Sequence, residues 1–268
     1  MNNNRIMNRI QEHLNDALNS KPTDWFVICG QGSINYPGLS DDQSDVDSKM
    51  LTVPSFKEIV QNLKPLNLVH VMDNDEHVDM KDLREYFKIF RKQNINFVEI
   101  LFTDYWVVNE YYEEYWLELM RYAEDFAHMN PYRTLKCCKG MVYEKAHALE
   151  HRYPSRLYYL DTFGYDGKQL QHALRILEFA EKFVKNYPYK DCLTVDDPET
   201  LLGIKRHTVG LSLEDARKMM DKAVRNIDNL EANYNSIWTD KEDQATKEKL
   251  DNILYELIKK AVWTELSH

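Results

Sequence analysis

The sequence predicts an α+β protein, in which a small mixed β-sheet with flanking helices is followed by a helical part. Strand-like and helix-like segments are mixed up to about residue 107, whereas residues 110–268 show almost only helical periodicity. Gly and Pro are scarce, at 8 each in 268 residues, which argues against a turn-rich all-β sandwich and long disordered linkers. We therefore expect two domains, residues 1–108 and residues 109–268.

Composition narrows the functional classes. The net charge of −10 argues against a protein that binds nucleic acid by bulk attraction to phosphate. No apolar run reaches the ~20 residues that span a bilayer, and the N-terminal residues lack the apolar region of a secretory signal. The four cysteines form no C-x-x-C pair, which makes a cysteine-built zinc site improbable. We expect a reduced, cytoplasmic setting without membrane contact.

The first part of the chain begins with an amphipathic helix over residues 5–19, because its apolar residues recur every fourth position. The apolar run Trp25–Cys29 predicts a buried strand, and Lys49–Val53 predicts a second strand that Pro54 stops. Further strands are predicted over 66–72 and 76–80, and helices over 55–63, 81–92 and 95–101.

The second part of the chain is predicted to be helical throughout. Apolar side chains recur at helical spacing over residues 110–128, 132–152, 166–186, 197–207, 212–235 and 241–264. Ser212 followed by Glu214 and Asp215 is the expected chemistry of a helix start.

The most informative stretch follows the first predicted strand. Gly32 and Ser33 form a glycine turn whose backbone N–H groups and hydroxyl can hold phosphate oxygens. Asp45 and Asp47 lie two residues apart and lead into the next strand, so alternation places both carboxylates on one face. A Mg²⁺ ion relieves the repulsion between them, since it prefers a few carboxylates completed by water and phosphate. Together these features indicate a phosphoryl or nucleotidyl transfer site.

A third acid is needed to hold a second metal ion or to take a proton. Asp79 is the choice, because it lies in the predicted strand 76–80, which can pair beside the Asp45/Asp47 strand. Asp75, Glu76 and Asp82 are rivals, and Asp82 is also placed to cap the following helix.

These residues carry a resemblance to a known family. The Gly-Ser turn, the D-x-D that begins twelve residues after the serine and the later acid on a strand resemble the DNA polymerase β-type nucleotidyltransferase superfamily. The sequence is more closely similar to its predicted nucleotidyltransferases of bacteria and phages, including a branch associated with RNA repair. The matching patches also include Val78–Arg84, Asn94–Leu101, Gly164–Lys168 and His172–Arg175, and they span roughly residues 26–180.

The resemblance implies a catalytic domain in residues 1–108, a nucleoside triphosphate substrate and two Mg²⁺ ions. It implies that Gly32 and Ser33 bind phosphates, that Asp45 and Asp47 bind metal, and that Asp79 is the third carboxylate. The expected reaction moves a nucleoside monophosphate from the triphosphate, ATP among the candidates, to an acceptor and releases pyrophosphate. The alternative is a catalytically silent nucleotide-binding module that acts as a sensor or as a partner of a toxin or defence protein.

Two basic groups in the helical part are further candidates. Lys168, His172 and Arg175 share one helix face, which we expect to contact the nucleotide, although a solvated face remains the alternative. Residues 133–156 are rich in Lys and Arg, which suits either a polynucleotide contact or an ordinary solvated helix. The acceptor stays open between an RNA end, a protein and a small molecule. The oligomeric state is also open, and a homodimer is the commonest arrangement.

Overall fold

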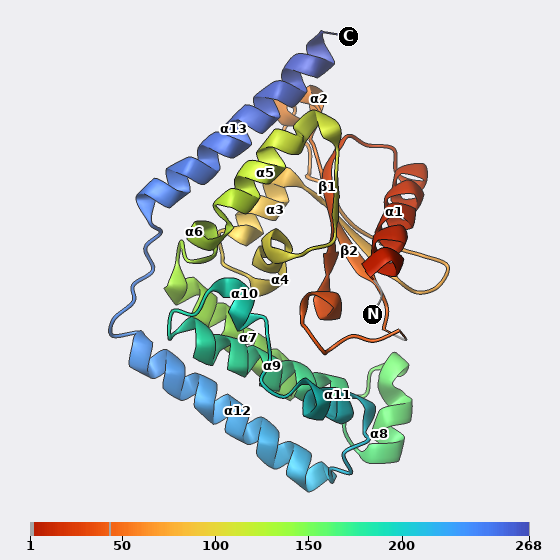
Figure 1. Cartoon of the computed structure of the whole chain (residues 1–268), viewed down its shortest axis with the longest axis vertical. Helices are drawn as coiled ribbons and strands as arrows, with labels where there is room; N and C mark the ends of the chain where they lie inside the picture. The colour runs from red at the N-terminus through yellow and green to blue at the C-terminus, as the bar shows by residue number, and fades with distance from the viewer. Residues whose placement is uncertain (1–2, 43, 268) are drawn as a thin grey trace. The chain divides into compact units, whose positions relative to one another are not determined.

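The computed structural model describes residues 3–42 and 44–267 and has the expected α+β architecture, with one five-stranded mixed sheet and many helices (Figure 1). The chain divides into two compact units. The first unit comprises Met1–Asn35, Ser40–Asn130 and Glu242–His268, and the second comprises Tyr36–Leu39 and Pro131–Lys241. This division differs from the expected boundary near residue 108, because three helices that follow the sheet in sequence belong to the first unit.

The sheet runs in the order β3-β4-β2-β1-β5. The strands are β1 Trp25–Gln31, β2 Asp47–Thr52, β3 Asn67–Val71, β4 His77–Asp82 and β5 Trp106–Val108. β2 and β4 pair in parallel, and all the other neighbours are antiparallel. The predicted strand 76–80 therefore lies beside the strand that follows the two aspartates, as the sequence indicated. The short strand β5 was not predicted, because three residues are too few to show a period.

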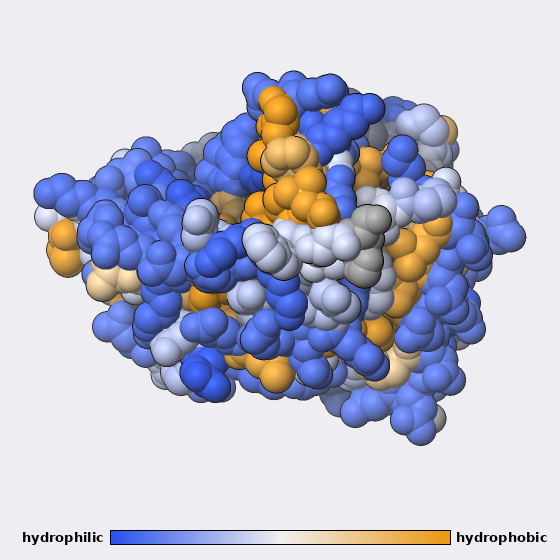
Figure 2. Space-filling model, turned by 90° about the horizontal axis from the view of Figure 1, so that it is seen from above, coloured by the Kyte–Doolittle hydropathy of each residue, from blue (hydrophilic) through white to orange (hydrophobic). Residues whose placement is uncertain are grey.

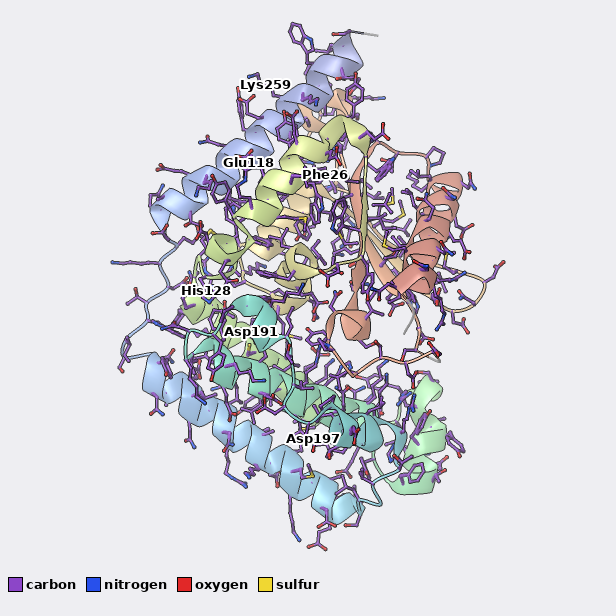
Figure 3. The ribbon with its side chains drawn as sticks, in the orientation of Figure 1. Phe26, Glu118, His128, Asp191, Asp197 and Lys259 are labelled. Carbon is purple, nitrogen blue, oxygen red and sulfur yellow. The ribbon has the colours of Figure 1, made fainter. Side chains whose placement is uncertain are left out.

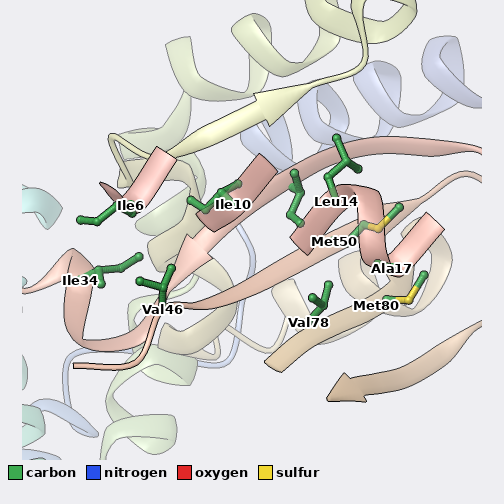
Figure 4. Close-up of a cluster of buried hydrophobic side chains, with 10 residues drawn as sticks. Ile6, Ile10, Leu14, Ala17, Ile34, Val46, Met50, Val78 and Met80 are labelled. Carbon is green, nitrogen blue, oxygen red and sulfur yellow. The ribbon is translucent and has the colours of Figure 1, made fainter. Parts of the chain in front are cut away.

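One face of the sheet is covered by α1, Asn3–Ser20. Its apolar residues, four apart in sequence, pack onto strand residues of the same cluster, as Figure 4 shows. The cluster comprises Ile6, Ile10, Leu14, Ala17, Ile28, Ile34, Val46, Met50, Val78 and Met80. Because alternate residues of a strand point to opposite faces, Met50 and Val78 face α1, whereas Lys49 and Asp79 face away from it.

Helices of the first unit cover the other face. They are α3 Leu83–Phe90, α4 Ile95–Val98, α5 Glu113–Arg121, α6 Ala123–Ala127 and the C-terminal α13 Gln244–Leu266, with a 3-10 turn over Glu99–Phe102. Phe26 of β1 meets Trp116 of α5 edge to face, with 6.0 Å between the ring centres, and lies in the interior of this unit (Figure 3). α13 packs along α5 and α6 and buries Leu250 and Leu257 there, so a distant segment completes this unit.

The second unit is built around one central helix. Its helices are α7 Pro131–Ala148, α8 Leu157–Phe163, α9 Gly167–Phe183, α10 Tyr189–Cys192, α11 Pro198–Arg206 and α12 Leu213–Tyr234. α9 packs against α7, α11 and α12, and ten of its residues are buried. Ser212 accepts the N–H of Asp215 and caps α12, as predicted. The short helices α8 and α10 were not predicted.

One face of the molecule is mostly hydrophilic. Figure 2 shows hydrophilic side chains over most of the face seen from above, with hydrophobic residues gathered in separate patches. Within the described residues, α2 Phe56–Val60 and the outer face of α13 expose large apolar side chains, among them Val60 and Trp263. Among those residues, the structure has no helix that is long and apolar enough to cross a membrane.

Candidate functional site

The glycine turn begins where β1 ends. Gly32 opens a 3-10 turn, Gly32–Asn35, with a φ of +75°, a conformation that glycine adopts without strain. The buried side chain of Ile34 anchors the turn to the core, and Asn35 donates from its side chain to the carbonyl of Gly30 at 3.0 Å. Ser33 is half-buried beside Gly32. The two residues that were predicted to bind phosphate therefore lie in a turn whose backbone is held in place.

The N–H of Gly32 already has a partner, which the sequence reasoning missed. It donates to the Oε1 atom of Glu99 at 3.0 Å, and Glu99 is buried in the 3-10 turn that follows α4. The available signal was an acid inside the apolar run Phe97–Leu101, which lies within the family-like patch Asn94–Leu101. A carboxylate at this position means that the Gly32 N–H is not free to hold a phosphate oxygen.

Asp45 and Asp47 lie at the same end of the sheet as the glycine turn. Asp47 is the first residue of β2, and its cross-strand partner is Gln31, the residue that directly precedes Gly32. Asp45 is exposed and Asp47 is half-buried, whereas Val46 between them is buried in the core under α1. The cross-strand register therefore places the backbone of Asp47 beside Gln31, one residue before the predicted turn.

His77 lies against this carboxylate pair. Its backbone N–H donates to Asp47 Oδ1 at 3.0 Å, and its ring atom Nδ1 is 3.3 Å from the same oxygen. Both side chains are partly exposed, at 47% for His77 and 39% for Asp47. The parallel pairing of β2 with β4 brings His77 here, because Ser48 and Val78 are partners one residue further along.

A buried network holds the segment between the two aspartates. Glu76 Oε1 accepts the backbone N–H of Val46 at 3.0 Å, and its Oε2 atom accepts from Arg9 Nε at 2.9 Å. His13 bridges Glu76 and Ser48, with its ring nitrogens 3.0 Å and 2.9 Å from their oxygens. Burial by itself raises the pKa of Glu76, but the hydrogen bonds from Arg9 and its other donors outweigh burial and lower it to about 2. Glu76 therefore stays ionised.

The predicted third acid, Asp79, lies between two lysines. Lys49 is its partner across β2 and β4, and Lys49 Nζ is 2.7 Å from Asp79 Oδ2. Lys81 Nζ is 3.0 Å from the other carboxylate oxygen. The Lys49 ammonium also lies 4.1 Å from the centre of the Phe97 ring. Burial lowers the pKa of Lys49, and the contact with Asp79 opposes that shift.

The three rival acids have other roles in the structure. Asp75 lies in the turn between β3 and β4 with a φ of +65°. Glu76 belongs to the network that holds Val46. Asp82 accepts the N–H of Arg84 at 2.7 Å and caps α3, as the sequence had allowed.

The donor set decides how many metal ions these residues fit. Among residues 3–42 and 44–267, no group of three or more His, Cys, Asp or Glu side chains is arranged to hold a metal ion. Asp45 and Asp47 could supply two carboxylate ligands to a Mg²⁺ ion, and phosphate and water would have to complete its shell. A second ion that needs Asp79 does not fit, since both oxygens of that carboxylate lie against lysine ammonium groups.

The three basic candidates lie on α9 in the second unit, and their environments differ. Lys168 is exposed, His172 is half-buried and Arg175 is buried. We expected all three on a face open to solvent or to a cleft, and for Arg175 that is wrong, because α9 is the packed centre of this unit. The Arg175 guanidinium stacks on Tyr36, with 3.6 Å from Cζ to the ring centre, and Tyr36 belongs to the same unit.

His172 is a neutral side chain near pH 7. Burial lowers its pKa well below 6.5, and the charges of Arg175 and Lys168 lower it further. The imidazole can therefore donate or accept one hydrogen bond, but it adds no positive charge to an anion site.

The basic residues of 133–156 mostly pair with acids of the second unit. Five of the six Lys and Arg side chains form ion pairs with carboxylates: Arg133 with Asp240, Lys139 with Asp228 and Glu231, Lys145 with Glu144, Arg152 with Asp161, and Arg156 with Asp166. These pairs favour an ordinary charged surface over a polynucleotide contact.

Comparison with known proteins adds little. No family model matches the chain, and no curated protein matches it either. Among solved structures, the chain is similar to a nucleotidyltransferase-like protein from Exiguobacterium sibiricum 255-15, at 13% sequence identity. The similarity covers 85% of this chain and 75% of that one, with a TM-score of 0.31. Since a likeness this weak carries no weight, the geometry of the residues has to support any functional conclusion.

Proposed function

We propose that the protein is a nucleotidyltransferase that acts on a nucleoside triphosphate with the help of a divalent cation. One observation carries the proposal: Asp47 pairs with Gln31, so the chain segment with Asp45 and Asp47 enters the sheet at the end where the Gly32–Ser33 turn begins. Carboxylates near a glycine turn are the chemistry that a metal-bound triphosphate requires.

Each part of this arrangement has a definite task. Ser33 supplies a hydroxyl donor to the terminal phosphates, and Gly32 lets the backbone approach them closely. Asp45 and Asp47 would hold the cation, which when bound withdraws negative charge from the phosphates and orients them. In the reaction, an acceptor oxygen forms a bond to the α-phosphorus, the bond from that phosphorus to the bridging oxygen breaks, and pyrophosphate leaves with that oxygen.

The charge of the protein limits the kinds of acceptor that it can bind. The net charge of −10 and the ion pairs along residues 133–156 disfavour a long duplex, because counterion release needs unpaired cationic side chains. We propose a compact acceptor that offers one hydroxyl or phosphate oxygen, such as an RNA end, a protein side chain or a small molecule.

A second candidate function is a catalytically silent module that binds a nucleotide and serves as a sensor or as a partner of a toxin or defence protein. A specific observation favours it: the Gly32 N–H is occupied by Glu99, and the Asp79 carboxylate is occupied by Lys49 and Lys81. When the Gly32 N–H and the Asp79 carboxylate already have partners, the site can still bind a nucleotide through its other groups, but it has fewer groups left for catalysis.

The test separates binding from turnover. Titration calorimetry with Mg²⁺ and each of the four ribonucleoside triphosphates should give binding that depends on Mg²⁺. A coupled assay with a panel of RNA ends, proteins and small acceptors should then detect pyrophosphate. The double variant Asp45→Asn, Asp47→Asn should lose both signals. The control variant Asp75→Asn, which changes an exposed acid in a turn that asparagine tolerates, should keep them.

Three results would decide between the candidates. Pyrophosphate release that survives in the double variant would exclude the proposed site. Binding without release against any acceptor would support the silent module. The absence of any triphosphate binding to the unaltered chain, with or without Mg²⁺, would exclude both functions.

A further inference from the structure

We infer that the site takes one divalent cation, and that the Lys49 ammonium group fills the electrostatic role of a second cation beside Asp79. This inference rests on the proposed function, because it concerns the metal stoichiometry of the same site. It departs from the expectation of two Mg²⁺ ions shared by Asp45, Asp47 and Asp79.

The contacts of Asp79 are the first argument. The two carboxylate oxygens each face a different ammonium group, at 2.7 Å for Lys49 and 3.0 Å for Lys81. Lys49 donates a charge-assisted hydrogen bond to Oδ2. Lys81 forms an ion pair with Oδ1 but donates its hydrogen bond to Asn67 Oδ1 at 2.6 Å, and the buried Asp79 Oδ1 atom has no hydrogen-bond partner among the described residues. A metal ion at Asp79 would lie beside two ammonium groups, which repel it.

The burial of Lys49 is the second argument. Its side chain is 3% exposed, and that of Asp79 is 16% exposed. A lysine that is pushed off its carboxylate inside the protein leaves an unpaired buried charge, which is far more costly than the loss of a surface pair. Lys49 therefore resists displacement by an ion that enters from solvent.

The surroundings of Lys49 are the third argument. The Phe97 ring faces its ammonium group at 4.1 Å. Lys49, Lys81, Asp79 and Glu99 together carry two positive and two negative charges, so the group is balanced without a metal ion. An added divalent cation would leave this group with excess positive charge.

The position of the group relative to Asp47 completes the case. Lys49 lies two residues after Asp47 on β2, so both side chains point to the same face of the sheet. The ammonium group thus lies on the face that carries the metal-binding pair. A fixed positive charge there can stabilise negative charge that develops on phosphate oxygens, without a second ion.

Metal stoichiometry tests the inference without measuring activity. The full chain is titrated with Mn²⁺ in the presence of a non-hydrolysable triphosphate, and bound Mn²⁺ is counted by electron paramagnetic resonance. We expect one Mn²⁺ per chain and no magnetic coupling between two ions. Asp79→Asn should leave the dissociation constant within about twofold, whereas Asp47→Asn should weaken it at least roughly tenfold.

A second variant guards against a failure to fold. In the double variant Lys49→Met, Asp79→Asn, both charges are removed together, so no uncompensated buried charge is created. This variant should also bind one Mn²⁺ with an unchanged dissociation constant, and circular dichroism establishes that it is folded.

The outcomes are distinguishable. Two coupled Mn²⁺ ions per chain, or loss of a bound ion in Asp79→Asn or in the double variant, overturns the inference and leaves the proposed function standing. If no Mn²⁺ binds with the triphosphate, the proposed function fails together with the inference.

Discussion

The carboxylate of Glu76 accepts the backbone N–H of Val46 at 3.0 Å. Val46 is the residue between Asp45 and Asp47, so an acid at the start of β4 holds the segment that carries the proposed metal ligands. The same carboxylate receives Arg9 and His13 of α1. The position of the aspartate pair therefore depends on a buried polar network under α1 as well as on the strand that follows it.

The first prediction concerns this network. Glu76→Gln removes the negative charge that Arg9 and His13 surround, and we expect the free energy of unfolding at pH 7 to fall by about 2–3 kcal/mol. The folded-state pKa of Glu76 is about 2, below the ordinary 4.5, so its stabilising contribution is present above pH 4.5 and is lost as the pH falls toward 2. Urea unfolding curves should therefore show that the difference in unfolding free energy between Glu76→Gln and the unaltered chain becomes smaller as the pH falls from 4.5 toward 2.

The control for this prediction is Glu12→Gln. Glu12 also pairs with Arg9, but its side chain is 55% exposed, and we expect a loss of at most about 0.5 kcal/mol. Equal losses for the two variants, or a Glu76→Gln difference that does not change with pH, would contradict the assignment.

The second prediction concerns His172. Its pKa in the folded state lies well below 6.5, because of burial and then of the nearby cations, so the folded chain binds fewer protons than the unfolded chain. Its contribution to stability is therefore complete above pH 6.5 and is lost as the pH falls below that value. His172→Gln should flatten the pH dependence of the unfolding free energy between pH 6.5 and 5, by at most about 1.4 kcal/mol per pH unit.

His147→Gln is the matched control, because His147 is an exposed histidine of the same unit. We expect His147→Gln to have a smaller effect than His172→Gln in the same urea titrations. A His172→Gln variant that loses stability as steeply as the unaltered chain would show that another group titrates there.

The third prediction compares two glycines of the second unit. A Cβ atom at Gly167 would lie 2.2 Å from the backbone oxygen of Ile204, so Gly167→Ala must push α9 and α11 apart. We expect a loss of about 3 kcal/mol in the free energy of unfolding. At Gly140, inside α7, a Cβ atom meets none of the described atoms within 4 Å, and Gly140→Ala should stabilise the protein by about 0.5–1 kcal/mol. Thermal and urea unfolding measure both, and equal effects would refute the predicted close approach of the two helices.

Most helices and strands could be predicted from the sequence in their correct order. The buried run Trp25–Cys29 and the four-residue spacing in α1 each gave the correct element, because burial of one face imposes its period on the chain. The assignment of α13 to the first unit was not readable. Its partner surface on α5 is more than a hundred residues away in sequence, and a helical period does not say what the apolar face packs against.

For the candidate site, the sequence predicted which residues to consider but not the contacts between them. Gly32, Ser33, Asp45 and Asp47 stood out because glycine turns and paired carboxylates are chemically conspicuous at short spacing. Glu99 and Lys49 did not stand out, since an acid or a lysine in an apolar run has no meaning until the cross-strand register gives it a partner.

The sequence by itself determined the α+β class, the strand that carries the glycine turn, and the presence of two aspartates two residues apart. These are local properties, set by the side-chain period and by backbone freedom. The tertiary structure alone decided that Asp79 faces two lysines, that Glu99 occupies the Gly32 N–H, and that Arg175 is buried on Tyr36. Pairing register and helix packing bring distant charges within hydrogen-bond distance, and electrostatic interactions depend on that distance rather than on separation along the chain.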